Sequence, residues 1–375
     1  MRRAVRTAGL RRARRLARSL RIACWNVNGL RSVLRHEADP LRRFVASARP
    51  DVLALSETKV DAALLPAFEG LLPGYDAHWA CCSTKKGYSG TAVFTAKALR
   101  ARVAPGDSRL APRGRDDAAD ARLNTEGRLL VAELERCVVV HTYVPNAGAG
   151  LGKLGARLDW DAALAQRLRE LAARHGDAKP LVWCGDLNVA HGEWDVHNPK
   201  LRDAPGYSLP EREGFGRLVG GLPDRPSALA RVRDPARRPS SAVPGGRGGG
   251  RGGGRRGGVE GGREGSEGEG EGKGEGEGEG GHSGHAPAPF FDAWRALHPH
   301  PREVASAALS EEPCPFTYFS ARGRAREKGK GWRLDYCVLA EALRPRLRAA
   351  HIHADVPGSD HLPISVDLDF ERALR

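Results

Sequence analysis

The sequence predicts an α/β protein with mixed β-sheets. Short apolar segments with polar or glycine-containing ends recur along the chain, which is typical of β-strands. Several are separated by stretches with the 3.6-residue periodicity of helices, whereas others follow one another directly. Connections of both kinds indicate sheets with parallel and antiparallel pairs. With 375 residues, of which 40% are hydrophobic, the chain is long enough to bury one large core.

The predicted strands are apolar runs that end in polar residues. They are residues 21–30, 51–59, 90–96, 129–134, 137–146, 181–189 and 332–340, and a last strand after residue 361. Helical periodicity predicts helices over Pro40–Ala48 and Asp159–His175, and three leucines of the second helix fall on one face. No run approaches the ~20 apolar residues of a membrane span, so we expect a soluble globular protein without a membrane partner.

Charge and cysteine content bear on the partner and the compartment. The net charge of +14 favours a phosphate-rich partner, because contacts with phosphates release counterions. A solvated surface with a basic tail explains the charge equally well. The seven cysteines are odd in number, include no C-x-x-C pair and lie mostly in apolar segments. They indicate buried thiols in a reducing compartment rather than disulfides or a zinc site.

Two segments do not have the composition of a packed domain. Residues 1–20 hold eight arginines and no acidic residue, which fits an organelle transit sequence, a nuclear-import signal, a nucleic-acid-binding arm or a tail without a role. Residues 221–289 are Pro/Arg-rich and then glycine-dominated, so we predict a disordered insertion at a surface turn. It is either a passive loop or a contact for RNA or DNA. The packed domain is expected over 21–220 and 290–375.

Polar side chains lie where the predicted strands end or begin. They are Asn26, Asn28, Glu57, Tyr143, Asn146, Asp186, Asn188, Asp335, Asp360 and His361. Ligands of α/β proteins bind where strand ends converge, and carboxylates and amides there suit a hard cation such as Mg²⁺. Each residue alone has a plain alternative, such as a solvated strand end for Glu57 or a turn for Asp186 and Asn188. Together they match phosphate hydrolysis, which needs metal ligands, a base for water and donors to the oxyanion.

Several short motifs carry a resemblance to a known enzyme class. They are WNVNGLR at 25–31, ETK at 57–59, GYSG at 87–90, EGR at 126–128, YVPNAG at 143–148, GDLNVAH at 185–191, NPK at 198–200, ERxGFG at 211–216, GWRLDY at 331–336 and GSDHLPI at 358–364. In these motifs and their order the sequence resembles the exonuclease III class of apurinic/apyrimidinic (AP) endonucleases, within the endonuclease/exonuclease/phosphatase superfamily. YVPNAG and GWRLDY point to the DNA-repair branch. The resemblance implies a four-layer, DNase I-like α/β sandwich, with two packed mixed β-sheets flanked by helices.

The resemblance also implies a divalent metal at the strand ends. Glu57 would ligate Mg²⁺, or Mn²⁺ in its place, with Asn28 and Asp360 nearby through direct or water-mediated contacts. The side chains that would border the same metal are Asp186, Asn188 and His361.

The remaining implied roles belong to water attack on phosphorus. Asp186 would be the general base, and Asn188 and Asn26 would position the water. His361, held by Asp335, would donate to the scissile phosphate as charge builds up. The side chains that would contact this phosphate are Tyr143 and Asn146. In-line attack would leave a 3′-hydroxyl and a 5′-deoxyribose phosphate.

Selectivity for a missing base requires a pocket that a normal nucleotide does not enter. By resemblance, Trp332 and Leu334 would wall this pocket, and Phe316 is expected as the third wall, because the family has an aromatic residue before its Thr-Tyr pair. Phe319 stands where the family inserts a side chain into the duplex. Core packing is an equal alternative for both phenylalanines.

Three positions depart from the family pattern. Ala149 stands where some relatives carry an arginine that reaches DNA, so we expect weaker product retention. Ser56 replaces a common glutamine, with no consequence that the sequence shows. The loop at residues 319–331 is longer and more basic than usual, and we expect it to contact backbone phosphates without reading the sequence.

We therefore expect a monomeric enzyme of base excision repair that cuts double-stranded DNA 5′ to abasic sites, in the nucleus or a DNA-containing organelle. Activities as a 3′-phosphodiesterase and a 3′→5′ exonuclease fit the same site. Two alternatives stay open: a superfamily relative that acts on another phosphodiester, and a catalytically silent protein that binds nucleic acid. Trp332 and YVPNAG speak against the first, and the intact set of polar residues speaks against the second.

Overall fold

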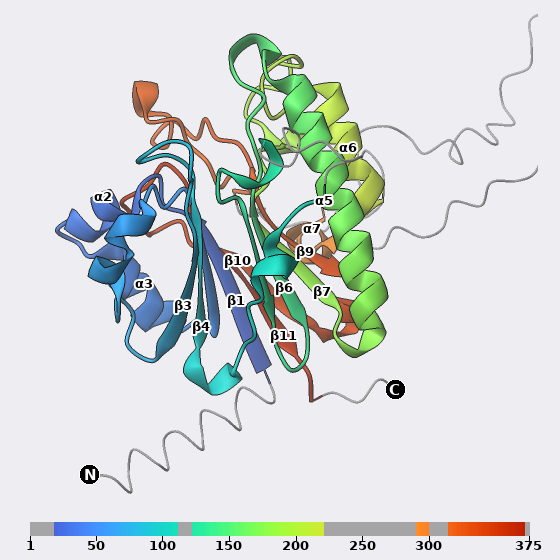
Figure 1. Cartoon of the computed structure of the whole chain (residues 1–375). Coiled ribbons are helices and arrows are strands. Elements are labelled where there is room, and N and C mark those ends of the chain that lie inside the picture. Colours follow the sequence, from blue (N-terminus) through green and yellow to red (C-terminus); the bar gives the residue numbers. More distant parts are fainter. Residues whose placement is uncertain (1–18, 112–121, 221–289, 300–313, 372–375) are drawn as a thin grey trace, which may run out of the picture. The chain divides into compact units, whose positions relative to one another are not determined.

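The computed structural model describes residues 19–111, 122–220, 290–299 and 314–371 (Figure 1). The predicted insertion and all but the last two residues of the predicted basic tail lie outside these residues, so both stay predictions. Within the described part of the chain, no helix is both long and apolar enough to cross a membrane.

Two β-sheets form the centre of the domain. Within the described residues, the first sheet has six strands in the order β10-β11-β1-β2-β4-β3, and the second has five in the order β5-β6-β7-β9-β8. The first contains β1 (Ser19–Asn26), β2 (Val52–Ser56), β3 (Tyr75–Ala80), β4 (Thr91–Ala96), β10 (Leu347–Ile352) and β11 (Ile364–Asp369). The second contains β5 (Leu129–Glu133), β6 (Val138–Tyr143), β7 (Leu181–Asp186), β8 (Phe290–Asp292) and β9 (Asp335–Ala340). Each sheet is mixed, because β1 pairs with β2 and β6 with β7 in parallel, beside antiparallel neighbours.

The two sheets pack face to face, and helices cover their outer faces (Figure 1). The inner core joins apolar side chains of both sheets and holds four of the cysteines as free thiols: Cys24, Cys137, Cys184 and Cys337. The helices α2 (Leu30–Arg35) and α3 (Pro40–Ala48) pack on the first sheet. The helices α5 (Leu154–His175) and α6 (Leu209–Val219) pack on the second. The predicted four-layer α/β sandwich is confirmed.

The two predicted helices are present, one with different bounds. Pro40–Ala48 forms α3 as predicted, with Pro40 in the first turn and the apolar face of Leu41 and Phe44 buried. The helix predicted from Asp159 begins five residues earlier, at Leu154. Its first turn lacks an apolar stripe and is held instead by Arg157, whose guanidinium donates to backbone carbonyls of the neighbouring loops.

Three strands were not predicted, and each lies at or near a sheet edge. β3 and β10 are edge strands of the first sheet, and β8 is an edge strand of the second. β3 and β10 have partly exposed residues in place of an apolar run, and β8 has only three residues. The sequence does not reveal β3 and β10 because exposed residues interrupt their apolar pattern, nor β8 because it is so short. By contrast β5, the other edge strand of the second sheet, is buried and has a clear apolar run.

The strand directions bring the polar ends of five strands to one edge of the sandwich. β1, β2, β6 and β7 end there, and the antiparallel β9 begins there. Register places Tyr143, Asp186 and Asp335 side by side on three neighbouring strands. At Gly185, φ is +138° and an added Cβ would lie 1.9 Å from the carbonyl oxygen of Thr142, so only glycine allows β6 and β7 to approach here.

A buried ion network supports the segment that leads into β9. The guanidinium of Arg333 contacts Asp195 at 2.8 Å and Asp292 at 2.6 Å, and Arg295 contacts Asp195 at 2.7 Å. Burial opposes ionisation of Asp195, but Arg333 and Arg295 outweigh it and lower its pKa. The network therefore links β8, the loop around Asp195 and the start of β9.

We expect Arg333→Met to lower the free energy of unfolding by about 3–5 kcal/mol, because it removes the cation that two buried carboxylates share. Arg42→Met is the matched control, since Arg42 pairs with Asp39 on the surface and should cost less than about 1 kcal/mol. Denaturant unfolding of both variants measures the difference. A loss of unfolding free energy in Arg333→Met as small as that expected for Arg42→Met would show that the network adds no stability.

Candidate active site

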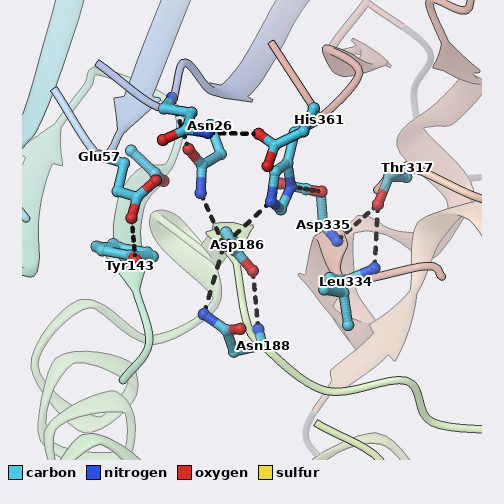
Figure 2. Close-up of polar contacts among 12 residues, drawn as sticks. Asn26, Glu57, Tyr143, Asp186, Asn188, Thr317, Leu334, Asp335 and His361 are labelled. Carbon is cyan, nitrogen blue, oxygen red and sulfur yellow. Dashed lines mark hydrogen bonds and ion pairs between the residues drawn. The ribbon is translucent and has the colours of Figure 1, made fainter. Parts of the chain in front are cut away.

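Asp186 lies at the centre of a buried group of polar side chains at the end of β7. Its Oδ2 accepts from the Nδ2 of Asn26 at 2.9 Å, and its Oδ1 accepts from the backbone N–H of Asn188 at 2.9 Å. Figure 2 shows Asp186 between Asn26 at the end of β1, Asn188 just after β7, and His361 just before β11. The exposed fraction is 2% for Asp186 and 6% for His361. A carboxylate held in this way has a fixed direction toward the edge of the sandwich.

His361 connects two carboxylates. Its Nδ1 is 2.7 Å from Oδ2 of Asp335, and its Nε2 is 3.9 Å from Oδ2 of Asp186. The Asp335 contact fixes the ring and leaves Nε2 for the reacting side, as catalytic histidines require. The hydroxyl of Thr317 accepts from the backbone N–H groups of Leu334 and Asp335, which holds this strand end in place.

The pKa values of Asp186 and His361 are both raised, for different reasons. Burial raises the pKa of Asp186, with a further rise from Asp335, while His361 opposes the shift. Burial disfavours protonation of His361, but Asp335 and Asp186 outweigh it and raise the pKa of the imidazole. A carboxylate with a raised pKa is a stronger base, and a histidine with a raised pKa is a cationic donor near neutral pH.

The metal-side residues form a second, more open chain of contacts. The Nδ2 of Asn28 donates to Asp360 at 3.1 Å, and the ammonium of Lys59 donates to Oδ1 of Asn28 at 2.5 Å. Lys59 also lies 3.7 Å from Glu57, and the hydroxyl of Tyr143 donates to Glu57 at 2.7 Å. The three predicted metal-side residues are thus brought to one place beside the buried centre.

Three of the predicted site residues have a left-handed backbone. The φ angles are 43° at Asn28, 55° at Glu57 and 48° at Asn188. Asparagine tolerates this conformation, but glutamate adopts it rarely. Strained residues of this kind persist where function requires a particular side-chain direction. Glu57 therefore occupies a strained position at the end of β2 that aims its carboxylate at Tyr143.

Of the residues predicted to contact phosphate, Tyr143 lies on the metal side against Glu57 (Figure 2), and Asn146 lies beside Asn188. The Nδ2 of Asn146 donates to Oδ1 of Asn188 at 2.9 Å. The guanidinium of Arg128 lies 4.5 Å from the centre of the Tyr143 ring and donates to the Tyr143 carbonyl. A cavity of about 860 Å³ opens here, with Tyr143, Asn146, Arg128 and Lys153 among its lining residues. Its cations suit a strand of phosphates that passes the catalytic centre.

Trp332 and Leu334 lie together in an apolar cluster beside His361. The cluster also contains Ala190, Val196, Tyr207 and Tyr318. We call the side chains of Trp332, Leu334 and Tyr318 the apolar wall. It reaches the catalytic centre, because the ring of Tyr318 lies 4.8 Å from the ring of His361.

The structure does not bring Phe316 or Phe319 to the apolar wall. Both belong to a separate cluster with Ala325 and Leu362. Phe319 is 7% exposed, so its ring is buried rather than projecting toward a duplex. Tyr318, two residues further along, packs in the cluster of Trp332 and Leu334, and residue 318 pairs with residue 332. For both phenylalanines the geometry favours the core-packing alternative.

Sequence reasoning missed three residues that the structure places at the site: Lys59, Thr317 and Tyr318. Lys59 belongs to the ETK motif at residues 57–59, but nothing in its spacing shows that its ammonium reaches Asn28. Thr317 and Tyr318 come from a segment far along the chain from Asp186 and Asn26. Only the folded chain shows which of its side chains face the centre.

The donor set fits a divalent cation. In the described part of the chain, the ligand atoms of Asp186, Asp335 and His361 lie within 4.8 Å of one another. One oxygen of Asp335, Oδ1, is buried without a hydrogen-bond partner. The carboxylates of Glu57 and Asp360 lie outside this group, where Glu57 accepts from Tyr143 and Asp360 accepts from Asn28. Oxygen donors of this kind suit hard cations.

Comparison with known proteins agrees with this chemistry. Residues 23–361 match the Endonuclease/Exonuclease/phosphatase family. The chain belongs to this family. It is 31% identical over 355 residues to the DNA repair nuclease APEX1 of Danio rerio, covering 94% of this chain and 83% of that protein. It is 29% identical over 349 residues to an exodeoxyribonuclease of Bacillus subtilis, covering 92% and 98%.

A solved structure shows the same fold. The AP endonuclease LMAP of Leishmania major superposes with a TM-score of 0.64 at 24% identity, covering 94% of this chain and 88% of that one. The predicted resemblance to the exonuclease III class of AP endonucleases is confirmed, as is the prediction of a hydrolytic nuclease of DNA repair. Enzymes of this family depend on divalent metals, and the acidic and histidine side chains of this site are consistent with that dependence.

We expect Glu57→Gln to weaken Mn²⁺ binding by about tenfold or more, because it removes a carboxylate from the metal side. Glu69→Gln, an exposed change away from the site, is the matched control. Isothermal titration of each protein with Mn²⁺ in the absence of DNA measures the affinity. Unchanged binding in the Glu57 variant would remove Glu57 from the ligand set.

Proposed function

We propose that this enzyme hydrolyses the phosphodiester 5′ to an abasic site in double-stranded DNA, with Mg²⁺ as its metal. One observation carries the proposal: the catalytic centre of Asp186 and His361 adjoins the apolar wall. A phosphate-hydrolysing group beside an apolar surface suits a sugar that has lost its base. The relative of Dictyostelium discoideum is named a DNA-(apurinic or apyrimidinic site) endonuclease, and its 28% identity over 93% of this chain supports the same substrate.

The arrangement supports a single in-line displacement. Asp186 takes a proton from water while Asn26 and Asn188 hold the carboxylate in place. The water oxygen bonds to phosphorus as the bond from phosphorus to the 3′ oxygen breaks, and that oxygen leaves as a hydroxyl after it takes a proton from solvent. His361 donates to a phosphate oxygen as negative charge builds up.

A divalent cation would be held from the open side by Glu57, with Asn28 and Asp360 close by. When bound, it supplies positive charge that stabilises the developing charge on the phosphate oxygens. Tyr143 keeps its proton, because burial and the charge of Glu57 raise its pKa. Its phenol is therefore neutral, and in this structure its proton is donated to Glu57.

Three further expectations extend the proposal. The enzyme acts as a monomer, and 3′-phosphodiesterase or 3′→5′ exonuclease activity uses the same centre. Its compartment is the nucleus or a DNA-containing organelle, for which the arginines of residues 1–20 are the supporting observation. Activity on another phosphodiester is the competing function, and it requires a site without the apolar wall.

A duplex with one abasic analogue tests the proposal directly. We expect Mg²⁺-dependent cleavage 5′ to the analogue, with a 3′-hydroxyl and a 5′-deoxyribose phosphate at the ends. The same duplex without the analogue is the control and should stay uncut at that position. Cleavage that persists in EDTA would contradict the metal requirement, and equal cleavage of both duplexes would contradict the substrate.

We expect Asp186→Asn and His361→Ala each to lower the rate of incision by about 10²–10⁴-fold, because each removes a proton-transfer group. Asp177→Asn, an exposed change just after the end of α5, is the control and should leave the rate unchanged. Circular dichroism should show the same fold for all three. A near-normal rate in either active-site variant would rule out the mechanism.

The basic loop supports contact with the DNA backbone. Arg322, Lys328 and Lys330 are exposed, while the loop is anchored by buried Ala325 and by Arg326, which donates to the carbonyl of Val356. The measured quantity is the slope of the logarithm of the DNA association constant against the logarithm of the salt concentration. Replacing the three exposed cations with Gln should make this slope less negative by about 0.9 for each phosphate that the protein no longer neutralises. Lys97, Arg100 and Arg136, at the opposite edge of the sheets, form the matched triple control. An unchanged slope in the loop variant would exclude the contact.

A further inference from the structure

A buried polar contact joins the two sheets one layer beneath the catalytic edge. Ser56 ends β2 of the first sheet, and His141 lies on β6 of the second. Both are 0% exposed, and the Oγ of Ser56 lies 3.4 Å from the Nε2 of His141. Two residues before them, on the same faces of their strands, Ala54 and Val139 belong to the apolar inner core. The contact is therefore the last layer of this core before the strand ends that carry the site.

Hydrogen bonds fix the ring of His141 and its tautomer. The Nδ1 lies 3.2 Å from the carbonyl oxygen of Cys184 on β7. A carbonyl only accepts, so Nδ1 carries a proton, and the Nε2 of the neutral ring accepts from the hydroxyl of Ser56. Gly185 leaves room for this ring, because an added Cβ there would lie 3.1 Å from Nδ1. His141 thus connects the backbone of β7, two residues before Asp186, to the side chain that ends β2.

Ser56 lies directly before Glu57, the residue predicted to bind the metal. Glu57 has a left-handed φ of 55°, and a strained backbone of this kind persists only where its surroundings hold it. The carbonyl of Ser56 accepts from the backbone N–H of Val27 at 3.0 Å, and its hydroxyl is held by His141. One layer nearer the edge, the phenol of Tyr143 donates to Glu57 across the sheets at 2.7 Å (Figure 2). Contacts between β2 and β6 therefore occur in two adjacent layers, and the inner contact supports the outer one.

We infer that His141 and Ser56 form a positioning pair, which sets where the carboxylate of Glu57 lies relative to Asp186. The inference rests on the proposed role of Glu57 as a metal ligand. The short side chain of Ser56, which stands where glutamine is common in the family, leaves space between the sheets. The imidazole of His141 fills this space and supplies the hydrogen-bond acceptor. Groups that hold a metal ligand from behind fix its direction and thereby raise the affinity for the metal.

Mn²⁺ binding in the absence of DNA tests the inference, measured by isothermal titration of Ser56→Ala, His141→Leu and the double variant. We expect each single change to weaken binding by about tenfold, as is usual when a group that orients a metal ligand is lost. The double variant should bind no more weakly than the weaker single variant, because both changes remove one and the same interaction. His141→Gln keeps a donor and an acceptor, so its affinity should stay within about threefold of that of the unaltered protein.

Thr142→Val is the matched control. It removes the buried hydrogen bond that the indole of Trp183 donates to Thr142 at 2.8 Å, on the same strand as His141 but on the opposite face. In denaturant unfolding its midpoint should fall as that of Ser56→Ala does, while its affinity for Mn²⁺ stays unchanged. Equal weakening of Mn²⁺ binding in Thr142→Val would show that lost stability, and not positioning, explains the effect.

Unchanged Mn²⁺ binding in Ser56→Ala and His141→Leu, or effects that add in the double variant, would overturn the inference. Ser56→Ala is the smaller change and decides the test if His141→Leu does not fold. Failure of the proposed metal ligand has a different signature, since Glu57→Gln would then bind Mn²⁺ normally and the inference would fall with it. A loss of affinity in Glu57→Gln, with full affinity in both single variants of the pair, would overturn the role of the pair alone.

Discussion

The alignment of β6, β7 and β9 is the constraint on which the site depends. Register places Tyr143, Asp186 and Asp335 in one row, and the parallel pair of β6 and β7 requires a glycine at 185 to approach closely enough. A shift of one residue would turn every side chain of a strand to the opposite face of its sheet. The carboxylate of Asp186 would then point away from His361. The inner core of the two sheets, which resists such a shift, is therefore also what holds the catalytic centre together.

The catalytic centre is a buried polar group, and such a group is stable only when its members bond to one another. Asn26, Asn188 and His361 surround Asp186, and Asp335 holds His361. The same burial that demands these contacts raises the pKa of Asp186 and so strengthens it as a base. Stability and reactivity thus have one physical origin. The metal-side residues are more open, which allows a cation and a phosphate to reach them from solvent.

Much of the fold could be predicted because it depends on apolar pattern. The bounds of α3 follow from helical periodicity and a proline in the first turn. The central strands follow from apolar runs that are buried on both faces. The strands β3 and β10 escaped prediction because exposed residues interrupt their apolar pattern, and β8 escaped it because it has only three residues. The start of α5 escaped it too, because Arg157 supports the first turn through hydrogen bonds that no periodicity reveals.

The sequence by itself determined which residue types stand at the strand ends, and these residues, with their motifs, already specified a phosphate-hydrolysing enzyme of this family. Local order is enough for that, because each polar residue directly follows or precedes its strand. The tertiary structure alone decided which side chains meet across the sandwich. Phe316 and Tyr318 are two residues apart, and the pairing of residue 318 with 332 and 361 places Tyr318 at the wall and leaves Phe316 in a separate cluster. Such pairings join residues that are distant in the sequence. No local pattern shows which face of a short, irregular segment is used for pairing, so only the folded chain reveals it.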